Sequence, residues 1–378
     1  MSIEFYLPGK TRTAPFGAGT WADSDRLSRA TAMLRRLVLG RSIIGRIARA
    51  GLVTAVVGAS AVCAVQANAN ASADPRGLMY DVGGGRQMRL VCEGPVSSGR
   101  PVVVFESGAF GFSGDWAHVQ RQLTAQGVRS CAYDRAGMGL SDPSDAPRDG
   151  VSVARDLETL LAVAKVPAPY VLVGHSMAGA RVHLFANRNP SKVAGLVLVD
   201  STTPEAMDDP QVRQYVSGFT AAASMADRTA RFGILRLLAV TPLGDKVGLP
   251  AEEDVEKRWQ FGSPSYERTA YLETRNWPLA AAQARQTGPL NPRWPVAVVA
   301  AGVMDTDEGQ QMQALQPPPA LASDHGYVAV VGGATHNGLL GAKYSPAIVK
   351  GIDFVLRAAT DRSVRPGVTM DGAELASR

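Results

Sequence analysis

A serine near the middle of the chain has the local sequence of a reactive nucleophile. The apolar run Val171–Val173 leads into Gly-His-Ser-Met-Ala at 174–178, and a helical apolar pattern follows. A serine on so sharp a strand-to-helix turn projects its hydroxyl out of the fold, and the turned backbone has room only for small residues two positions away, here Gly174 and Ala178. Because a serine hydroxyl is a weak nucleophile at neutral pH, Ser176 needs a base and an orienting carboxylate.

Four further stretches have the spacing that would surround such a serine. They are Pro101–Trp116, Cys131–Asp142, Leu196–Asp200, and the pair Val296–Asp305 with Val328–His336. Together with the serine turn, they make residues from about 77 to 360 resemble the α/β-hydrolase superfamily, in its cap-bearing serine esterase-like branch. The resemblance implies the α/β class: a mostly parallel eight-stranded sheet flanked by helices, with a helical cap inserted between the sixth and seventh strands.

The resemblance also points to the base and the acid. Of the five histidines, only His336 follows an apolar strand and precedes a loop, which is where this fold brings a base to the serine. Asp305 stands at the family's usual acid position and completes the order Ser, Asp, His. Asp200 is the alternative acid, because it ends the sixth strand and some relatives place their carboxylate there. The expected catalytic residues are therefore Ser176, Asp305 and His336, with Asp200 as the alternative.

The oxyanion hole is expected to consist of two backbone N–H groups. One belongs to Met177, directly after the nucleophile, and the other to Ala109, in the loop after the third strand. Relatives often carry histidine where this chain has Ser107, and Ser107 is expected to fix the loop by hydrogen bonding. Phe110 and Phe112, next to that loop, are the candidate substrate-binding residues.

The patterns along the chain predict how these residues are positioned. Strand-like runs lie at 102–106, 130–134, 170–174 and 194–199. Helical patterns alternate with these runs, which favours a parallel sheet. Residues 201–294 break the alternation with prolines between short helical patterns, as expected for the helical cap. The hydrolase core is then expected at 74–200 and 295–360, followed by a flexible tail at 361–378.

Composition fits a globular enzyme and argues against a nucleic-acid partner. Hydrophobic residues make up 46% of the 378 residues and charged residues 19%. The net charge of +5 comes from residues 1–73, which carry nine Lys/Arg and three Asp/Glu and leave −1 for the remainder. The scattered histidines and the lack of a Gly-rich phosphate loop predict no metal and no cofactor. We therefore expect a small-molecule, ester-type substrate.

The first 73 residues have the composition of an export leader. Five arginines between positions 35 and 49 precede an uncharged stretch at 50–73, whose apolar part is short for a membrane span. Ala-x-Ala runs between Ala67 and Ala73 suit signal peptidase, and Met33 is an alternative start that would leave a signal of about forty residues. We expect a periplasmic or extracellular protein with no stable membrane span after cleavage. An uncleaved anchor helix is the alternative.

Cysteine usage agrees with export. Removal of the leader leaves two cysteines, Cys92 and Cys131. The resemblance places them on neighbouring strands, where an oxidising compartment would permit a disulfide. Two buried free thiols are the alternative.

The sequence as a whole predicts an exported serine hydrolase that cleaves carboxylic esters or lactones through an acyl-enzyme. Carbon–carbon bond hydrolysis or acyl transfer on the same triad is one alternative. A catalytically silent binding protein on this fold is another, of a different class. Epoxide hydrolases and haloalkane dehalogenases are disfavoured, because relatives with those activities carry aspartate where this chain has Ser176.

Overall fold

The chain divides into two units, Met1–Ser72 and Ala73–Arg378. The computed structural model describes residues 76–97, 99–233, 235, 247–303, 307–361, 363–370 and 373–375, all in the second unit. The expected leader at 1–73, with its alternative start at Met33, lies outside the described residues. Within the described ranges, no helix is long and apolar enough to cross a membrane.

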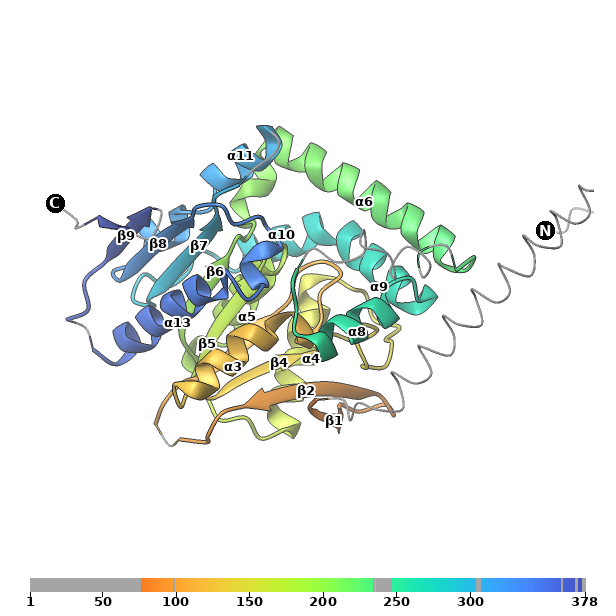
Figure 1. Ribbon diagram of the computed structural model, residues 1–378, viewed down its shortest axis with the longest axis horizontal. Coiled ribbons are helices and arrows are strands. Elements are labelled where there is room, and N and C mark those ends of the chain that lie inside the picture. The colour runs from red at the N-terminus through yellow and green to blue at the C-terminus, as the bar shows by residue number, and fades with distance from the viewer. Residues whose placement is uncertain are drawn as a thin grey trace, which may run out of the picture. The chain divides into compact units, whose positions relative to one another are not determined.

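A sheet of ten strands forms the centre of the second unit, in the order β1-β2-β4-β3-β5-β6-β7-β8-β9-β10 (Figure 1). The strands are β1 (Leu78–Asp81), β2 (Gln87–Glu93), β3 (Val102–Glu106), β4 (Ser130–Tyr133), β5 (Tyr170–His175), β6 (Val193–Val199), β7 (Val296–Ala301), β8 (Gly326–Val331), β9 (Gly367–Met370) and β10 (Ala373–Leu375). The strands from β4 to β9 pair in parallel, whereas β1, β2 and β10 pair antiparallel. The predicted mostly parallel sheet is confirmed, but it has ten strands rather than the eight expected, because β9 and β10 extend it.

The end of the chain differs from the flexible tail expected at 361–378. There β9 pairs in parallel with β8, and β10 pairs antiparallel with β9. Without β9, strand β8 would be an edge with unpaired backbone groups. The β-favouring residues Val368 and Thr369 supply a partner for it, so the described part of the segment extends the sheet.

Helices cover both faces of the sheet. On one face, α3 (Ala117–Ala125) and α13 (Ser345–Thr360) lie side by side, in front of the strands in Figure 1. Against the other face pack α4 (Gly150–Val163) and α5 (Ala178–Arg188), and α10 (Trp277–Gln286) packs on these two helices. A parallel sheet is buried on both faces, which explains why its strands are nearly continuous apolar runs.

Strand β3 shows how its side chains divide between the two core layers. Successive strand residues point to opposite faces. Val102 and Val104 therefore belong to the core cluster beneath α4 and α5, and Val103 and Phe105 belong to the cluster beneath α3 and α13.

The segment between β6 and β7 is helical, as predicted for the cap. It contains α6 (Pro210–Ala230), α8 (Ala251–Gln260), α9 (Pro264–Arg275) and α10. Its described residues form no strand. Helix α6 begins at a proline and is capped by Asp209, whose carboxylate accepts hydrogen bonds from the backbone N–H groups of Gln211 (2.7 Å) and Val212 (3.2 Å). Two short helices, α11 (Asp307–Ala314) and α12 (Pro318–Leu321), separate β7 from β8.

The antiparallel pairing of β2 with β4 brings the two cysteines together. Cys92 lies opposite Cys131 in the register, and a disulfide joins them across a sequence separation of 39 residues. The bond closes a loop that includes β3 and the chain that follows it. A disulfide of this kind stabilises a fold mainly by restricting its unfolded chain.

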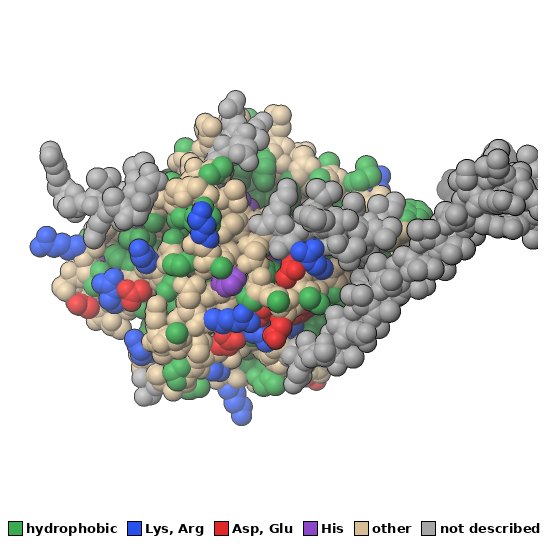
Figure 2. All heavy atoms as spheres, viewed as in Figure 1, with side chains coloured by type: hydrophobic (Ala, Val, Ile, Leu, Met, Phe, Trp, Pro, Cys, Tyr) green, Lys and Arg blue, Asp and Glu red, His purple; other side chains and the backbone are tan. Residues whose placement is uncertain are grey.

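Charged side chains are mixed on the surface shown in Figure 2. Basic and acidic groups are interspersed there among apolar and polar residues. On this face, the part of the chain that is described does not present the one-sided basic field that a nucleic-acid surface requires.

Candidate active site

Ser176 sits on a strained turn between β5 and α5. Its φ is +59°, in the left-handed region that side-chain-bearing residues rarely adopt. Neighbouring backbone holds it there, because the Ser176 N–H donates to the carbonyl of Val199 (3.1 Å) and the Ser176 carbonyl accepts from Gly179 (3.2 Å) and Thr202 (3.1 Å). Such strain persists only where the surrounding structure enforces it, which is common at catalytic positions.

Two glycines permit the close approaches around this turn. A Cβ on Gly179 would lie 2.5 Å from the Thr202 carbonyl oxygen. A Cβ on Gly108, in the loop after β3, would lie 2.8 Å from the Ser176 Cβ. Glycine therefore lets the loop after β3 pack directly against the serine, and the sequence pattern around Ser176 has its explanation in this crowding.

His336 and Asp200 form a close pair beside the serine. The His336 Nδ1 lies 2.6 Å from Asp200 Oδ2. Burial by itself would raise the pKa of Asp200, but hydrogen bonds from His336, Gln316 (2.9 Å) and the Ala301 N–H (3.1 Å) lower it. The carboxylate is therefore ionised and can accept a hydrogen bond from Nδ1 of His336.

The carboxylate at His336 is the alternative acid of the sequence analysis. Asp305, which the sequence favoured, lies outside the described residues. Asp200 directly follows β6, and its N–H donates to the Val299 carbonyl at 2.8 Å. Because β6 pairs with β5, its carboxyl end lies next to the serine turn. In the structure, Asp200 therefore occupies the position that orients His336.

The two predicted oxyanion donors are backbone groups at this site. Ala109 lines the cavity next to Ser176, and Met177 directly follows the serine. Among the described residues, neither of these N–H groups takes part in a hydrogen bond. Ser107 fixes the loop as expected: its hydroxyl donates to the Phe112 carbonyl (3.0 Å) and accepts from the indole of Trp116 (3.0 Å).

His175, the residue before Ser176, packs against His336. Its ring stacks on the His336 ring, with 4.5 Å between centroids and 29° between planes. Its Nε2 lies 3.4 Å from the His336 carbonyl oxygen. Burial, with a smaller contribution from the neighbouring His336, lowers the pKa of His175 to about 3. A neutral ring therefore braces the base. The motif offered no signal of this contact, since the contact joins residues 161 positions apart.

His175 should make the stability of the protein depend on pH. Its pKa in the folded protein, about 3, lies below the ordinary value of 6.5, so below pH 6.5 the unfolded chain binds a proton that the folded protein excludes. Stability should fall as the pH drops from 6.5 towards 3. We expect His175→Asn to remove about 2–3 kcal/mol of the loss between pH 7 and pH 4. Urea unfolding at both pH values measures it, and equal losses in the two proteins would refute the assignment.

Ser176 and His336 open into one cavity of about 610 Å³. Aromatic side chains form part of its wall: Phe110, Tyr215, Phe219 and Trp277. Phe219 contacts the other three rings, at centroid distances of 6.0 Å to Phe110, 6.2 Å to Tyr215 and 6.4 Å to Trp277. Charged residues of α8, among them Lys257, form another part of the wall. The cavity offers both an apolar surface and a polar one.

Of the two phenylalanines predicted to bind substrate, only Phe110 lines this cavity. Phe112 is 0% exposed and belongs to the core layer beneath α3, so its prediction as a pocket residue is wrong. The chain turns inward after Gly111, where the Phe112 N–H donates to Asp115 (3.3 Å) and its ring lies beneath Lys257. The side chains of Phe110 and Phe112 point in different directions although they are only two residues apart in a tight loop, and the sequence did not distinguish them.

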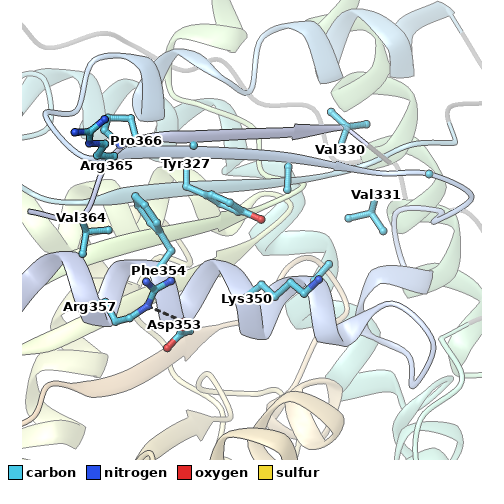
Figure 3. Close-up of a pocket in the computed structure, with 14 residues that line it drawn as sticks. Tyr327, Val330, Val331, Lys350, Asp353, Phe354, Arg357, Val364, Arg365 and Pro366 are labelled. Carbon is cyan, nitrogen blue, oxygen red and sulfur yellow. Dashed lines mark hydrogen bonds and ion pairs between the residues drawn. The ribbon is translucent and has the colours of Figure 1, made fainter. Parts of the chain in front are cut away.

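A larger hollow of about 940 Å³ lies between β8, β9 and α13 (Figure 3). Figure 3 shows Lys350, Asp353 and Arg357 on α13, with Tyr327 on the strand side, and Asp353 pairs with Arg357 at 2.9 Å. Neither Ser176 nor His336 lines it. This hollow is larger than the cavity at Ser176, but the candidate catalytic residues Ser176 and His336 line the smaller cavity.

Comparison with known proteins gives the family. A family model described as alpha/beta hydrolase fold matches residues 101–301, more than half of the 378-residue chain. The chain belongs to the alpha/beta hydrolase fold family. The matched region of this alpha/beta hydrolase runs from β3 to the end of β7, so it includes Ser176, Asp200 and the helical insertion.

Curated relatives of this alpha/beta hydrolase share only part of its length. A protein of Gibberella zeae named as an AB hydrolase superfamily protein is 30% identical over 138 residues, which are 35% of this chain and 42% of that protein. The uncharacterized protein YqjL of Bacillus subtilis is 35% identical over 99 residues, 26% of this chain and 38% of YqjL. An uncharacterized protein of Schizosaccharomyces pombe is 42% identical over 83 residues, 22% and 15% of the two chains. The chain thus spans less than half the length of each of these relatives.

Solved structures resemble this alpha/beta hydrolase over most of their length. A variant of an epoxide hydrolase from Bacillus megaterium is 18% identical, with a TM-score of 0.56 over 73% of this chain and 99% of that one. The protein Cfl2 from Burkholderia cenocepacia is 21% identical, with a TM-score of 0.56 over 73% and 94%. At these identities the likeness shows the fold alone. The fold supports a hydrolase, and the substrate must be argued from the site.

Proposed function

We propose that this alpha/beta hydrolase is an exported serine hydrolase that cleaves carboxylic esters or lactones through an acyl-enzyme. The observation that carries the proposal is the pairing of His336 with the buried Asp200 at 2.6 Å, with His336 and Ser176 lining one cavity. A base oriented by a buried carboxylate next to a strained serine turn is the arrangement that activates a serine hydroxyl.

Each residue of this triad has a proposed chemical role. Nε2 of His336 takes the hydroxyl proton of Ser176 while the serine oxygen attacks the carbonyl carbon of the ester. When the tetrahedral intermediate collapses, the bond to the alcohol oxygen breaks and His336 returns the proton to that oxygen. Water then repeats these steps on the acyl-enzyme and releases the acid. Asp200 stays ionised throughout and stabilises the imidazolium of His336.

The negative charge of the intermediate needs donors that are already in place. The free N–H groups of Ala109 and Met177 are the proposed donors, since no described residue occupies them. Fixed backbone dipoles stabilise a developing oxyanion without reorganising, and losing one such donor typically costs about 3–4 kcal/mol. A carbonyl substrate fits this machinery because its oxygen gains charge in the transition state.

The cavity wall favours a substrate with an apolar acyl or alcohol group. The rings around Phe219 form a continuous apolar surface. Each buried methylene group contributes about 0.8 kcal/mol to binding. We therefore propose esters with an apolar chain rather than small polar ones.

Export is proposed on two independent features. The sequence of residues 1–73 has the arginine-rich, apolar and Ala-x-Ala succession of a signal peptide. The disulfide between Cys92 and Cys131 is a bond that persists in oxidising compartments and is rare in the cytosol. Both features favour a periplasmic or extracellular location.

Hydrolysis of p-nitrophenyl esters of increasing acyl length tests this proposal. We expect ester turnover, with kcat/KM rising about threefold to fourfold for each added methylene group until the chain fills the cavity. Phe219→Ala should flatten that rise because it removes the centre of the aromatic wall. An epoxide and a haloalkane serve as controls. Turnover of either control, with no turnover of any ester, would contradict the proposal.

A further inference from the structure

A buried group of four charges lies directly beneath the loop after β3. The group consists of Glu106, Arg135, Arg181 and Glu273, and none of these side chains is more than 3% exposed. They come from four different elements: the end of β3, the turn after β4, helix α5 and the cap helix α9. The proposed function assigns no role to any of them.

All five N–H donors of Arg135 have acceptors, either in this charged group or in the loop after β3. Nε donates to Glu273 (2.8 Å and 3.1 Å), and Nη1 donates to Glu106 (3.2 Å) and to the Ser107 carbonyl (2.8 Å). Nη2 donates to the carbonyls of Gly108 (2.9 Å) and Gly111 (3.3 Å). Three of the five donors therefore hold carbonyls of the loop that contains Ala109. A lysine has three donors on one atom and cannot reproduce this fork.

Holding the Gly108 carbonyl also fixes the direction of the Ala109 N–H. The two groups belong to one peptide unit, and that peptide is trans, so they point in opposite directions. The carbonyl points at Arg135, which is 1% exposed and does not line the cavity. The N–H therefore points away from Arg135, on the side where Gly108 and Ala109 face the cavity.

The loop contains one residue in an unfavourable conformation, and its Gly108 carbonyl also accepts from the Gly111 N–H at 3.2 Å. Phe110 has φ +53°, an unfavourable value for a residue with a large side chain. The cap helix α9 supplies a second restraint here, because the Tyr266 hydroxyl donates to the Phe110 carbonyl at 2.5 Å. Tyr266 and Glu273 are seven residues apart, so they lie on the same face of α9 and reach the loop together.

The charges within the group compensate one another. Burial alone would raise the pKa of Glu273, but Arg135 and Arg181 lower it to about 2. Glu106 accepts from both arginines at 3.2 Å and also from the hydroxyl of Tyr133. Glu273 is the carboxylate that the cap helix α9 supplies to this group. If the cap helix moved away, two buried guanidinium groups would lose a carboxylate partner.

We propose that Arg135 is a positioning residue that aims the Ala109 N–H at the oxyanion, and that Glu273 and Tyr266 make this aim depend on the docked cap helix α9. The inference rests on the proposed function, because it assigns Ala109 to an oxyanion hole. It predicts that the insertion controls the rate of the chemical step as well as access to the cavity.

The variant Arg135→Lys tests the inference, with Arg89→Lys as the matched control. Arg89 is also buried, and it also links a core carboxylate, Asp134 (2.6 Å), to a cap carboxylate, Glu256. Its hydrogen bonds go to neither Ala109 nor its neighbours in the loop at 107–111. We expect Arg135→Lys to lower kcat on a p-nitrophenyl ester about 100-fold, with KM within threefold of the wild-type value. Arg89→Lys should keep kcat within threefold of wild type.

Tyr266→Phe provides a second test that removes one hydroxyl and leaves the buried charges in place. We expect kcat to fall about tenfold with KM unchanged, and circular dichroism should show a folded protein. Equal losses of kcat in Arg135→Lys and Arg89→Lys would overturn the inference, as would a rise in KM alone. Failure of the proposed function looks different: the wild-type protein would neither turn over esters nor react with a fluorophosphonate, and the inference would fall with it.

Discussion

Ser176→Ala should lower kcat for ester hydrolysis by about 10⁶-fold, to the rate that binding and the oxyanion hole alone support. The loss is this large because the triad acts as a unit, and without the serine oxygen no acyl-enzyme forms. Initial rates with a p-nitrophenyl ester measure it. Ser265→Ala, which changes an exposed serine on the cap helix α9, is the matched control and should keep the wild-type rate.

A loss of less than about tenfold in Ser176→Ala would contradict the mechanism. It would mean that water attacks the ester directly, or that another group is the nucleophile. The folded state of the variant is readily compared with the wild type, because the backbone hydrogen bonds to Val199, Gly179 and Thr202 do not involve the hydroxyl.

Asp200→Asn should lower kcat by about 10⁴-fold, whereas Asp305→Asn should leave it within tenfold of wild type. The asparagine keeps the shape of Asp200 but removes the charge that stabilises imidazolium, and it allows Nδ1 of His336 to take the wrong tautomer. Asp200 also accepts from Gln316 and the Ala301 N–H, and these contacts should hold the substituted side chain in place. The rate ratio of the two variants is the measurement.

The opposite ranking would return the acid to the loop after β7. A large loss in Asp305→Asn with a small loss in Asp200→Asn would show that the working enzyme pairs His336 with Asp305. Equal, large losses would show that both carboxylates act on the base in turn. The first result would refute the role given to Asp200, and the second would refute the expectation that Asp200 acts without Asp305.

The placement of Ser176 and His336 at one cavity was predictable because their signals are local. Ser176 is identified by the small residues two positions to either side, and His336 by the apolar strand before it and the loop after it. Close packing around a turn and the burial of a strand both leave a mark on adjacent residues. The central parallel strands were predictable for the same reason, since they are nearly continuous apolar runs.

The carboxylate that pairs with His336 was harder to choose from sequence. Asp200 and Asp305 both follow apolar strands, and nothing in either local sequence says which loop reaches His336. The choice depends on which strand end lies nearer the serine turn, and β6 is the immediate neighbour of β5. That is a property of the assembled sheet rather than of any single segment.

The buried charges were not predictable at all. Glu106, Arg135, Arg181 and Glu273 are spread over 167 residues, and each occurs in a segment that also reads as an ordinary strand end, turn or helix. Only the folded core shows that they share one site. The net charge of a segment does not show whether its charged side chains are buried or exposed, and these four are buried.

The measurement that tests the central claim most directly is peptide mass mapping of the protein quenched in acid shortly after mixing with a p-nitrophenyl ester. The account predicts one acyl group, carried by the peptide that contains Ser176, and no acyl group on that peptide in Ser176→Ala. Turnover with an unmodified Ser176 peptide, or with the acyl group on a different residue, would contradict a serine acyl-enzyme.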